Sequence, residues 1–221
     1  MTALLDRVDA AYGDLPYMKR TQANRLRELI LNNNARNILE LGFFHGKSSA
    51  YIASVLEERG DGHLTTVDLG SARDRSPNIN GILSDLGLSH RVTPIFAHRS
   101  YTWELQKMLR ARPRPVVDLC YLDGGHTWDV SALGVFLVDR LLRPGGILVL
   151  DDLDWSIATS PALQKSPQKL SHYSDDEKTA KPIRILWEDV LPDMGYDHFA
   201  IHPNLGWAIA RKRGTSKQES Q

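Results

Sequence analysis

Short apolar runs alternate with segments of helical periodicity along most of this chain, and this alternation limits the fold more than any other feature. The apolar runs are "NILELG", "HLTTVDLG", "RVTPIFA", "PVVDLCYLD" and "GGILVLDD", and amphipathic stretches such as "KSSAYIASVLEERG" separate them. Strands that are apolar on both faces are typical of a parallel sheet covered by helices on both sides. The sequence therefore predicts an α/β fold with a doubly wound, mostly parallel sheet.

The segments outside this alternating core differ in character. Two amphipathic helices are expected before it, and a polar segment with Pro161, Pro167 and Pro182 follows it, which is typical of a lid or substrate loop. A further helix and two strands around "HPNLG" then predict an antiparallel terminal hairpin. We expect a single domain over residues 1–211, divided into a helical cap (1–35), a core (37–152), a lid-like excursion (153–182) and the helix with its hairpin (183–211), followed by a disordered tail (212–221).

Charge and hydropathy exclude several classes of partner. Acidic and basic residues number 27 each, which argues against a broad electrostatic grip on nucleic acid. No run of about 18 apolar residues is present, and the start "MTALLDRVDAAYGD" lacks the order of a secretory signal. We therefore expect no nucleic-acid or membrane partner and a cytoplasmic location.

The loop "ELGFFHGKSS" after the first apolar run has the composition of an anion-binding turn. Its glycines allow close backbone approach, and the N–H groups of the helix starting near Lys47 favour a carboxylate or phosphate. Asp68 closes the second strand, where an acidic side chain binds ribose hydroxyls in dinucleotide sites. Together they favour a nucleoside-containing ligand. The alternative for Asp68 is a carboxylate that caps a helix or a loop.

Four motifs, "ELGFFHGKSS", "TTVD", "YLDGGHTW" and "RPGGILVLDD", resemble those of the class I S-adenosylmethionine-dependent methyltransferases in order and spacing. More narrowly they are similar to the O-methyltransferases of the macrocin and catechol types, many of which use a divalent cation. The resemblance covers about Asn37 to Asp152 and implies a Rossmann-like seven-stranded sheet with a reversed last strand. It implies that S-adenosylmethionine contacts Glu40, Gly42, Phe43, Gly46, Ser48, Asp68, Ser100 and Asp123. The sequence departs from the family at the bulky Phe43, Phe44 and His45, and at Arg99.

The resemblance also implies the strand order 3-2-1-4-5, which brings the carboxyl ends of the fourth and fifth strands together. Neighbouring strands lie about 4.8 Å apart, so Asp123 would meet Asp151 and Asp152 there. Carboxylates held that close repel one another unless a cation or a shared proton intervenes. We predict Asp123, Asp151 and Asp152 as ligands of Mg²⁺ or another divalent cation, with Asp154 as a spare. The alternative is a polar strand end whose acids cap the next turn.

His126 follows Asp123 by three residues and is the candidate general base, with Asp123 beside it in the catalytic site. Imidazole exchanges protons near neutral pH, and a cation would assist by stabilising the acceptor oxyanion. A helix cap or a bond to a backbone carbonyl is the alternative for His126. Trp128 and Trp155 are expected to pack helix against sheet. The residues expected to wall the acceptor pocket are Tyr17, Met18, Gln22, His172 and Tyr173.

These observations predict a metal-assisted O-methyltransferase that acts on a small hydroxylated molecule such as a sugar, a phenol or a natural product. The alternatives are a metal-independent methyltransferase with His126 as base, a nicotinamide-dependent oxidoreductase, and a non-catalytic nucleoside-binding protein. A homo-oligomer is possible. The acceptor itself is not encoded in any motif of the sequence.

Overall fold

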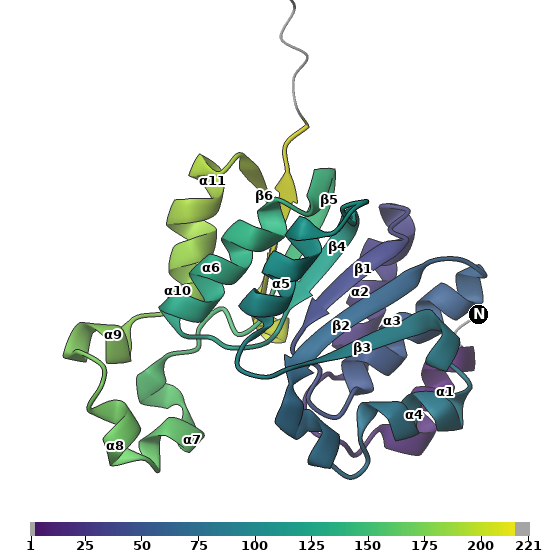
Figure 1. Cartoon of the computed structure of the whole chain (residues 1–221), viewed down its shortest axis with the longest axis horizontal. Helices are drawn as coiled ribbons and strands as arrows, with labels where there is room; N and C mark the ends of the chain where they lie inside the picture. Colours follow the sequence, from purple (N-terminus) through teal and green to yellow (C-terminus); the bar gives the residue numbers. More distant parts are fainter. Residues whose placement is uncertain (1–2, 215–221) are drawn as a thin grey trace, which may run out of the picture.

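The computed structural model describes residues 3–214 and contains one seven-stranded sheet with helices on both faces (Figure 1). The strands are β1 Asn37–Leu41, β2 His63–Leu69, β3 Val92–Ala97, β4 Val117–Leu122, β5 Leu142–Leu150, β6 Tyr196–His202 and β7 Trp207–Lys212. The longer helices are α1 Ala3–Tyr12, α2 Arg20–Asn32, α3 Lys47–Arg59, α4 Ile79–Leu86, α5 Tyr101–Arg110 and α6 Trp128–Asp139. Each of these elements lies where the sequence predicts one.

The strands run in the order β3-β2-β1-β4-β5-β7-β6. The first five are parallel, whereas β7 is antiparallel to β5 and β6 is antiparallel to β7. The predicted Rossmann-like sheet with an antiparallel terminal hairpin is therefore confirmed. Leu122 pairs with both Leu41 and Leu150, so β1, β4 and β5 end at the same level. The residues that follow these three strands must consequently lie side by side.

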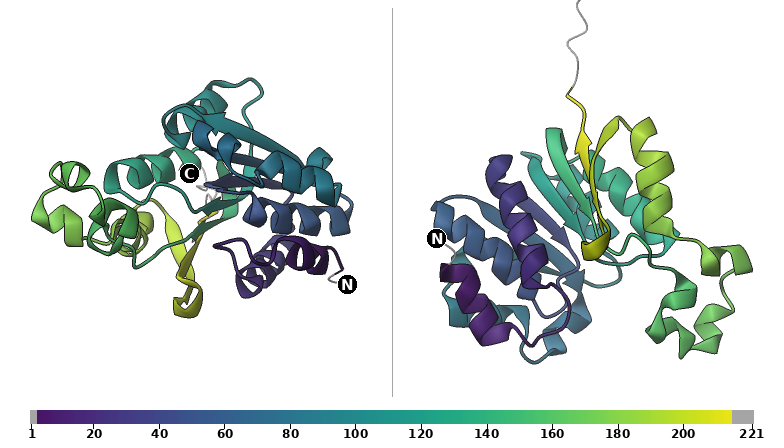
Figure 2. Two further views of the ribbon diagram at one scale, coloured as in Figure 1. Left: turned by 90° about the horizontal axis from the view of Figure 1, so that it is seen from below. Right: turned by 180° about the vertical axis from the view of Figure 1, so that it is seen from behind.

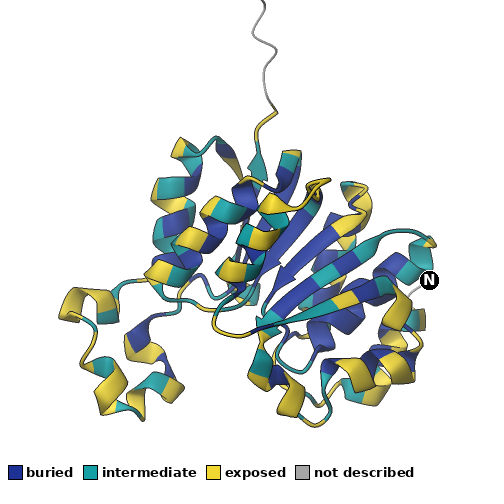
Figure 3. Ribbon diagram, in the orientation of Figure 1, coloured by how far each residue is buried: buried dark blue, intermediate teal, exposed yellow. Residues whose placement is uncertain are grey.

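Two apolar cores cover the two faces of the sheet (Figures 1 and 2). On β4, Tyr121 packs into the core formed with α1 to α4, while its neighbours Cys120 and Leu122 pack into the core formed with α5 and α6. This alternation is the period of two that a strand imposes on its side chains. Burial on both faces explains why the strands are apolar throughout, as Figure 3 shows for the central strands.

Residues 153–182, called the arm below, project beside the sheet and helix layers (Figure 1). The arm contains the short helices η3 Ile157–Thr159, α7 Pro161–Gln164, α8 Pro167–Leu170 and α9 Asp175–Thr179, and most of its residues are exposed (Figure 3). Pro161 and Pro167 each occupy the first turn of a short helix, where a missing N–H costs nothing. The prolines that we interpreted as signs of a loop therefore begin short helices.

The last helical segment consists of α10 Pro182–Ile185, the π-helical turn η4 Leu186–Val190 and α11 Leu191–Asp193. Pro192 has no N–H to donate to the preceding turn, which accounts for the irregular hydrogen bonding before it. Strand β7 includes Lys212, which is the first residue of the predicted tail. The predicted disorder of residues 215–221 lies outside the described residues. Within residues 3–214, no helix has the length and apolar composition needed to span a bilayer.

Candidate active site

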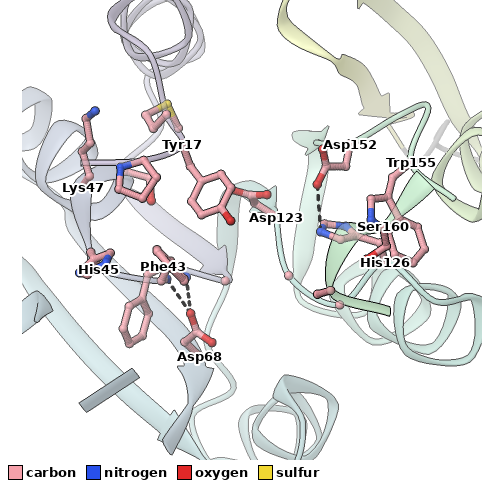
Figure 4. A pocket seen from close by; sticks show the side chains of 18 of the residues that line it. Tyr17, Phe43, His45, Lys47, Asp68, Asp123, His126, Asp152, Trp155 and Ser160 are labelled. Carbon is pink, nitrogen blue, oxygen red and sulfur yellow. Dashed lines mark hydrogen bonds and ion pairs between the residues drawn. The ribbon is translucent and has the colours of Figure 1, made fainter. Parts of the chain in front are cut away.

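A cavity of about 580 Å³ opens where β1, β2, β4 and β5 end (Figure 4). Figure 4 shows Tyr17, Phe43 and Asp68 on one side of this cavity and His126 and Asp152 on the other. Of the predicted site residues, the structure brings to it Gly42, Phe43, Ser48, Asp68, Asp123, His126 and Asp152. The cavity thus joins the predicted nucleoside end of the site to the predicted acidic end.

The loops after β1 and β4 touch through their backbones. Gly42 has a φ of +95°, and a Cβ on it would lie 2.2 Å from the carbonyl oxygen of Asp123. A Cβ on Gly124 would lie 2.9 Å from the Cα of Gly42. Glycine is required at both places, because any side chain would force the two strand ends apart. This close contact fixes Asp123 against the predicted cofactor loop.

Asp68 organises the loop that precedes α3. Its Oδ2 accepts hydrogen bonds from the backbone N–H groups of Phe43 (2.9 Å) and Phe44 (2.6 Å), as Figure 4 shows for Asp68. Its Oδ1 accepts one from the N–H of Leu69 (2.6 Å). The carboxylate therefore acts as the loop cap that was the alternative to ribose binding. It also lines the cavity, so both roles are compatible with its position.

Three predicted cofactor residues do not line the cavity. Glu40 is fully buried beneath it and accepts hydrogen bonds at Oε2 from the hydroxyls of Ser49 and Thr66. Burial raises the pKa of Glu40 to about 7. Gly46 faces Ile79 of α4, and Ser100 caps the N-terminus of α5. Their positions are those of supports for the loop and the helix.

Three side chains converge at the acidic end. Asp123, His126 and Asp152 each offer a ligand atom, and these atoms all lie within 4.8 Å of one another. His126 Nε2 lies 3.0 Å from Asp152 Oδ2 (Figure 4). His126 Nδ1 is buried and has no hydrogen-bond partner among the described residues. A set of two carboxylates and an imidazole suits a divalent cation.

Asp151 differs from the prediction that it joins this set. Its Oδ1 accepts a hydrogen bond from the N–H of Asp152 (2.7 Å), and its Oδ2 accepts one from the hydroxyl of Tyr121. Both oxygens of the buried Asp151 are thus engaged below the cavity. The spare ligand Asp154 is exposed and forms ion pairs with Lys181 (2.8 Å) and Arg184 (2.9 Å), directed away from the set.

The acids at this edge repel one another electrostatically. The hydroxyl of Tyr121 lies 3.0 Å from Asp123 Oδ2 and also contacts Asp151, yet it carries one proton. Burial raises the pKa of Asp123 well above its usual range, and the charges of Asp151 and Asp152 add to the effect. Burial likewise raises the pKa of Asp151 to about 6. Either a proton or a cation is needed to compensate this charge.

Backbone strain is concentrated around the cavity. Within residues 3–214, four residues other than glycine have a positive φ, and three of them, Tyr17 (65°), Phe44 (51°) and Asp152 (56°), line the cavity. Such conformations cost on the order of 1–3 kcal/mol each and persist where the surroundings enforce them, often at functional sites. Asp152 is in this way turned toward His126.

Lys47 is a site residue that the sequence analysis missed. It is buried at the start of α3 and lines the cavity, and its Nζ donates to the carbonyl oxygens of Gly13 and Leu15 at 2.7 Å each. Burial lowers its pKa. The sequence signal that could have identified Lys47 is its place in the first turn of a helix, where the helix dipole disfavours a cation. Lys47 fastens the segment before Tyr17 to the loop after β1.

Only some of the residues that we predicted to wall the acceptor pocket line this cavity. Tyr17 and Met18 line the cavity, whereas Gln22 bonds to Leu205 and the N–H of Lys19. Trp155 lines the cavity with its ring 5.4 Å from that of His126. The expectation that Trp128 packs against the sheet is wrong, since 46% of its surface is exposed. His172 and Tyr173 lie with Trp128 at a second cavity.

A methyltransferase-domain family matches residues 39–153, which is more than half of the chain. The chain belongs to this methyltransferase family. The resemblance to class I methyltransferases and the prediction of a methyltransferase are confirmed, and the alternative of a nicotinamide-dependent oxidoreductase is excluded. Comparison with curated protein sequences gives no match.

Solved structures share the fold of this methyltransferase-family chain. A putative caffeoyl-CoA O-methyltransferase from Staphylococcus aureus is 21% identical, with a TM-score of 0.65 over 94% of this chain and 90% of that chain. The O-methyltransferase TomG from Streptomyces achromogenes, in complex with SAM, is 21% identical, with a TM-score of 0.65 over 97% and 91%. An O-methyltransferase from Bacillus cereus in complex with SAH is 18% identical, with a TM-score of 0.64 over 96% and 89%.

Proposed function

We propose that this chain transfers a methyl group from S-adenosylmethionine to a hydroxyl of a small molecule, with a divalent cation at the acidic end of the cavity. The observation that carries the proposal is the convergence of Asp123, His126 and Asp152 in the cavity that also holds Asp68 and the loop after β1. One space thus offers groups for a nucleoside and groups for activating a hydroxyl.

The cofactor would lie between the loop after β1 and Asp68. Gly42, Phe43 and Ser48 present backbone and side-chain groups there, and the start of α3 favours the carboxylate of a methionine moiety. The TomG and Bacillus cereus structures are complexes with SAM and SAH respectively, which supports the same kind of ligand here. When bound, S-adenosylmethionine supplies an electrophilic methyl group on a sulfonium.

The cation would be held by Asp123 and Asp152, with Mg²⁺ as the candidate. Their donor atoms are close enough together, and the raised pKa of buried Asp123 is typical of acids that lack a compensating positive charge. The cation would lower the pKa of a bound hydroxyl. Asp151, although predicted as a ligand, would act from below by fixing Asp152 through its N–H and by holding Tyr121.

His126 would remove the proton of the acceptor hydroxyl. Its Nε2 lies 3.0 Å from Asp152 Oδ2, so the neutral ring donates from Nε2 and the acceptor's proton would go to Nδ1. The Asp152 carboxylate would then stabilise the imidazolium that forms. Trp155 packs against the imidazole and limits its rotation. The strained backbone of Asp152 holds the partner carboxylate in place. The chain's own residues would therefore orient the hydroxyl, accept its proton and exclude water.

Two measurements test this function in order. Calorimetry with S-adenosylhomocysteine and with NAD is expected to give binding of the first alone, and absence of S-adenosylhomocysteine binding would contradict the proposal.

Methyl transfer to catechol and to simple sugars is then measured with Mg²⁺ and with excess EDTA. Activity that EDTA abolishes and Mg²⁺ restores is expected. Activity unchanged by EDTA would favour the metal-independent alternative with His126 as base. Tight cofactor binding with no turnover on any acceptor would favour the non-catalytic alternative.

A further inference from the structure

A second cavity of about 410 Å³ lies between the start of α6 and the arm. It adjoins the first cavity along the chain at two places. His126 lines the first cavity and Thr127 the second, and Trp155 lines the first while Ile157 lines the second. The two cavities are therefore lined by neighbouring residues of the same two segments.

The second cavity is acidic. Asp129 lines it from α6, and Asp176 and Glu177 line it from α9. Within residues 3–214, its lining includes no lysine or arginine. Hydrogen bonding to Ser174 lowers the pKa of Asp176, so this carboxyl stays charged. The cavity thus offers three carboxylates to whatever enters it.

The cations nearest along the chain are engaged elsewhere. Lys178 pairs with Asp175 at 2.9 Å, and Lys181 and Arg184 both pair with Asp154. The described part of the chain therefore does not neutralise the lining from these positions. A cationic ligand would satisfy this charge, whereas an anionic one would be repelled.

Aromatic side chains complete the lining. Trp128 is the first residue of α6, is about half exposed and faces the cavity, and Tyr173 lines it from the arm. An indole left in contact with solvent next to carboxylates has the composition of a cation–π site, since the ring face attracts ammonium groups. The packing of α6 does not explain why the Trp128 side chain is exposed.

We propose that the second cavity binds a protonated amine of the methyl acceptor, with the ammonium group over Trp128 and near Asp129 and Asp176. The link to methyl transfer rests on the proposed function, but the binding itself does not. The acceptor class is then a hydroxylated amine, whose hydroxyl lies in the first cavity and whose ammonium lies in the second. The arm, which carries Tyr173 and Asp176, selects the acceptor.

The carboxylates have a competing explanation at the helix ends. Asp129 lies in the first turn of α6, and Glu177 caps α9 by accepting hydrogen bonds from the N–H and hydroxyl of Ser174. Acidic residues are favoured there by the helix dipole. This explanation accounts for each carboxylate separately. It does not account for their convergence with Trp128 and Tyr173 on one cavity.

Three probes that share a phenyl ring and a two-carbon chain test the proposal on the full chain: phenethylammonium, 2-phenylethanol and phenylacetate. Their affinities are measured by ligand-observed NMR titration without methyl donor or added metal. We expect phenethylammonium to bind at least about tenfold more tightly than the anion, with the alcohol between them. Equal affinities, or tighter binding of phenylacetate, would overturn the proposal.

Matched variants locate the binding. Trp128→Leu and Asp129→Asn are each expected to weaken phenethylammonium binding by about threefold or more. The controls Trp103→Leu and Asp193→Asn change an exposed tryptophan on α5 and an exposed acid on α11 outside the lining, and they should leave the affinity unchanged. If Trp128→Leu does not fold, the double variant Asp129→Asn with Asp176→Asn tests the same site. Variants that bind as the wild type does would refute the site.

The outcomes for this cavity and for the proposed function are separable. Binding of S-adenosylhomocysteine without preference for phenethylammonium refutes the amine site alone. Preference for phenethylammonium in a chain that binds no S-adenosylhomocysteine refutes the proposed methyl transfer alone. With an active hydroxylated amine, Asp129→Asn should raise KM more than it lowers kcat, because Asp129 would contact the ammonium group and not the reacting hydroxyl.

Discussion

The carboxyl ends of β1, β4 and β5, called the sheet edge below, and the arm contribute to the same site in different ways. At the sheet edge, Asp123 and Asp152 follow strands whose ends are fixed by register, and the backbone contact between Gly42 and Asp123 leaves no freedom. The arm is made of short exposed helices that begin at prolines and border both cavities. The difference supports the proposal that the chemistry resides on the rigid sheet and the choice of acceptor on the arm.

The largest expected effect comes from the sheet edge. Asp123→Asn should lower kcat by about 10²- to 10³-fold, because it removes one carboxylate from the proposed cation site. The melting temperature should not fall, since burial and neighbouring acids already disfavour the charge of Asp123. Steady-state kinetics and thermal unfolding measure the two effects. Full activity in this variant would remove the sheet edge from the chemistry.

His126→Gln tests the proposed base. We expect a loss in kcat of about 10²-fold, which is typical for removal of a general base, with little change in affinity for S-adenosylhomocysteine. Steady-state kinetics and calorimetry measure the two effects. A variant that retains the kcat of the wild type would show that His126 does not carry the proton.

Gly42→Ala tests the rigidity of the sheet edge. The added Cβ would meet the carbonyl oxygen of Asp123 at 2.2 Å in a residue with positive φ, so the free energy of unfolding should fall by about 3 kcal/mol or more. Gly60→Ala is the matched control, because Gly60 has a φ of +80° but nothing within 4 Å of the added Cβ. It should cost about 1 kcal/mol. Equal losses in urea unfolding would contradict a tight contact between the loops.

Glu40 predicts a pH dependence of stability. Burial raises its pKa from 4.5 to about 7, so the folded state binds this proton more tightly than the unfolded state does. The contribution is complete below pH 4.5 and is lost as the pH rises to 7, by up to about 3 kcal/mol. Glu40→Gln should therefore gain stability relative to the wild type between pH 5 and pH 8. A difference in free energy of unfolding between Glu40→Gln and the wild type that is the same at pH 5 and pH 8 would contradict this.

The smallest effect is expected on the arm. Asp154→Asn removes the ion pairs with Lys181 and Arg184, which are exposed, so the free energy of unfolding should change by less than about 1 kcal/mol. Activity and cation dependence should be those of the wild type. A loss of either would place Asp154 in the proposed cation site and reduce the contrast between sheet edge and arm.

The sequence predicts the sheet edge better than the arm for physical reasons. Apolar periodicity locates the strands, and strand order then brings Asp123 near Asp151 and Asp152. Which acids face the cavity depends on backbone detail, since the positive φ of Asp152 turns it toward His126 while Asp151 is held by Tyr121. The exposure of Trp128 depends on how the arm folds back, and no local pattern encodes that. The role of Lys47 likewise depends on a long-range contact, with Gly13.

The central claim is that Asp123 and Asp152 form a cation site beside His126. Electron paramagnetic resonance titration with Mn²⁺ in the presence of S-adenosylhomocysteine tests it directly, with the wild type compared with Asp123→Asn and Asp154→Asn. We predict one bound Mn²⁺ per chain in the wild type and in Asp154→Asn, and an affinity at least about tenfold weaker in Asp123→Asn. Undiminished Mn²⁺ binding by Asp123→Asn, or none by the wild type, would contradict the claim.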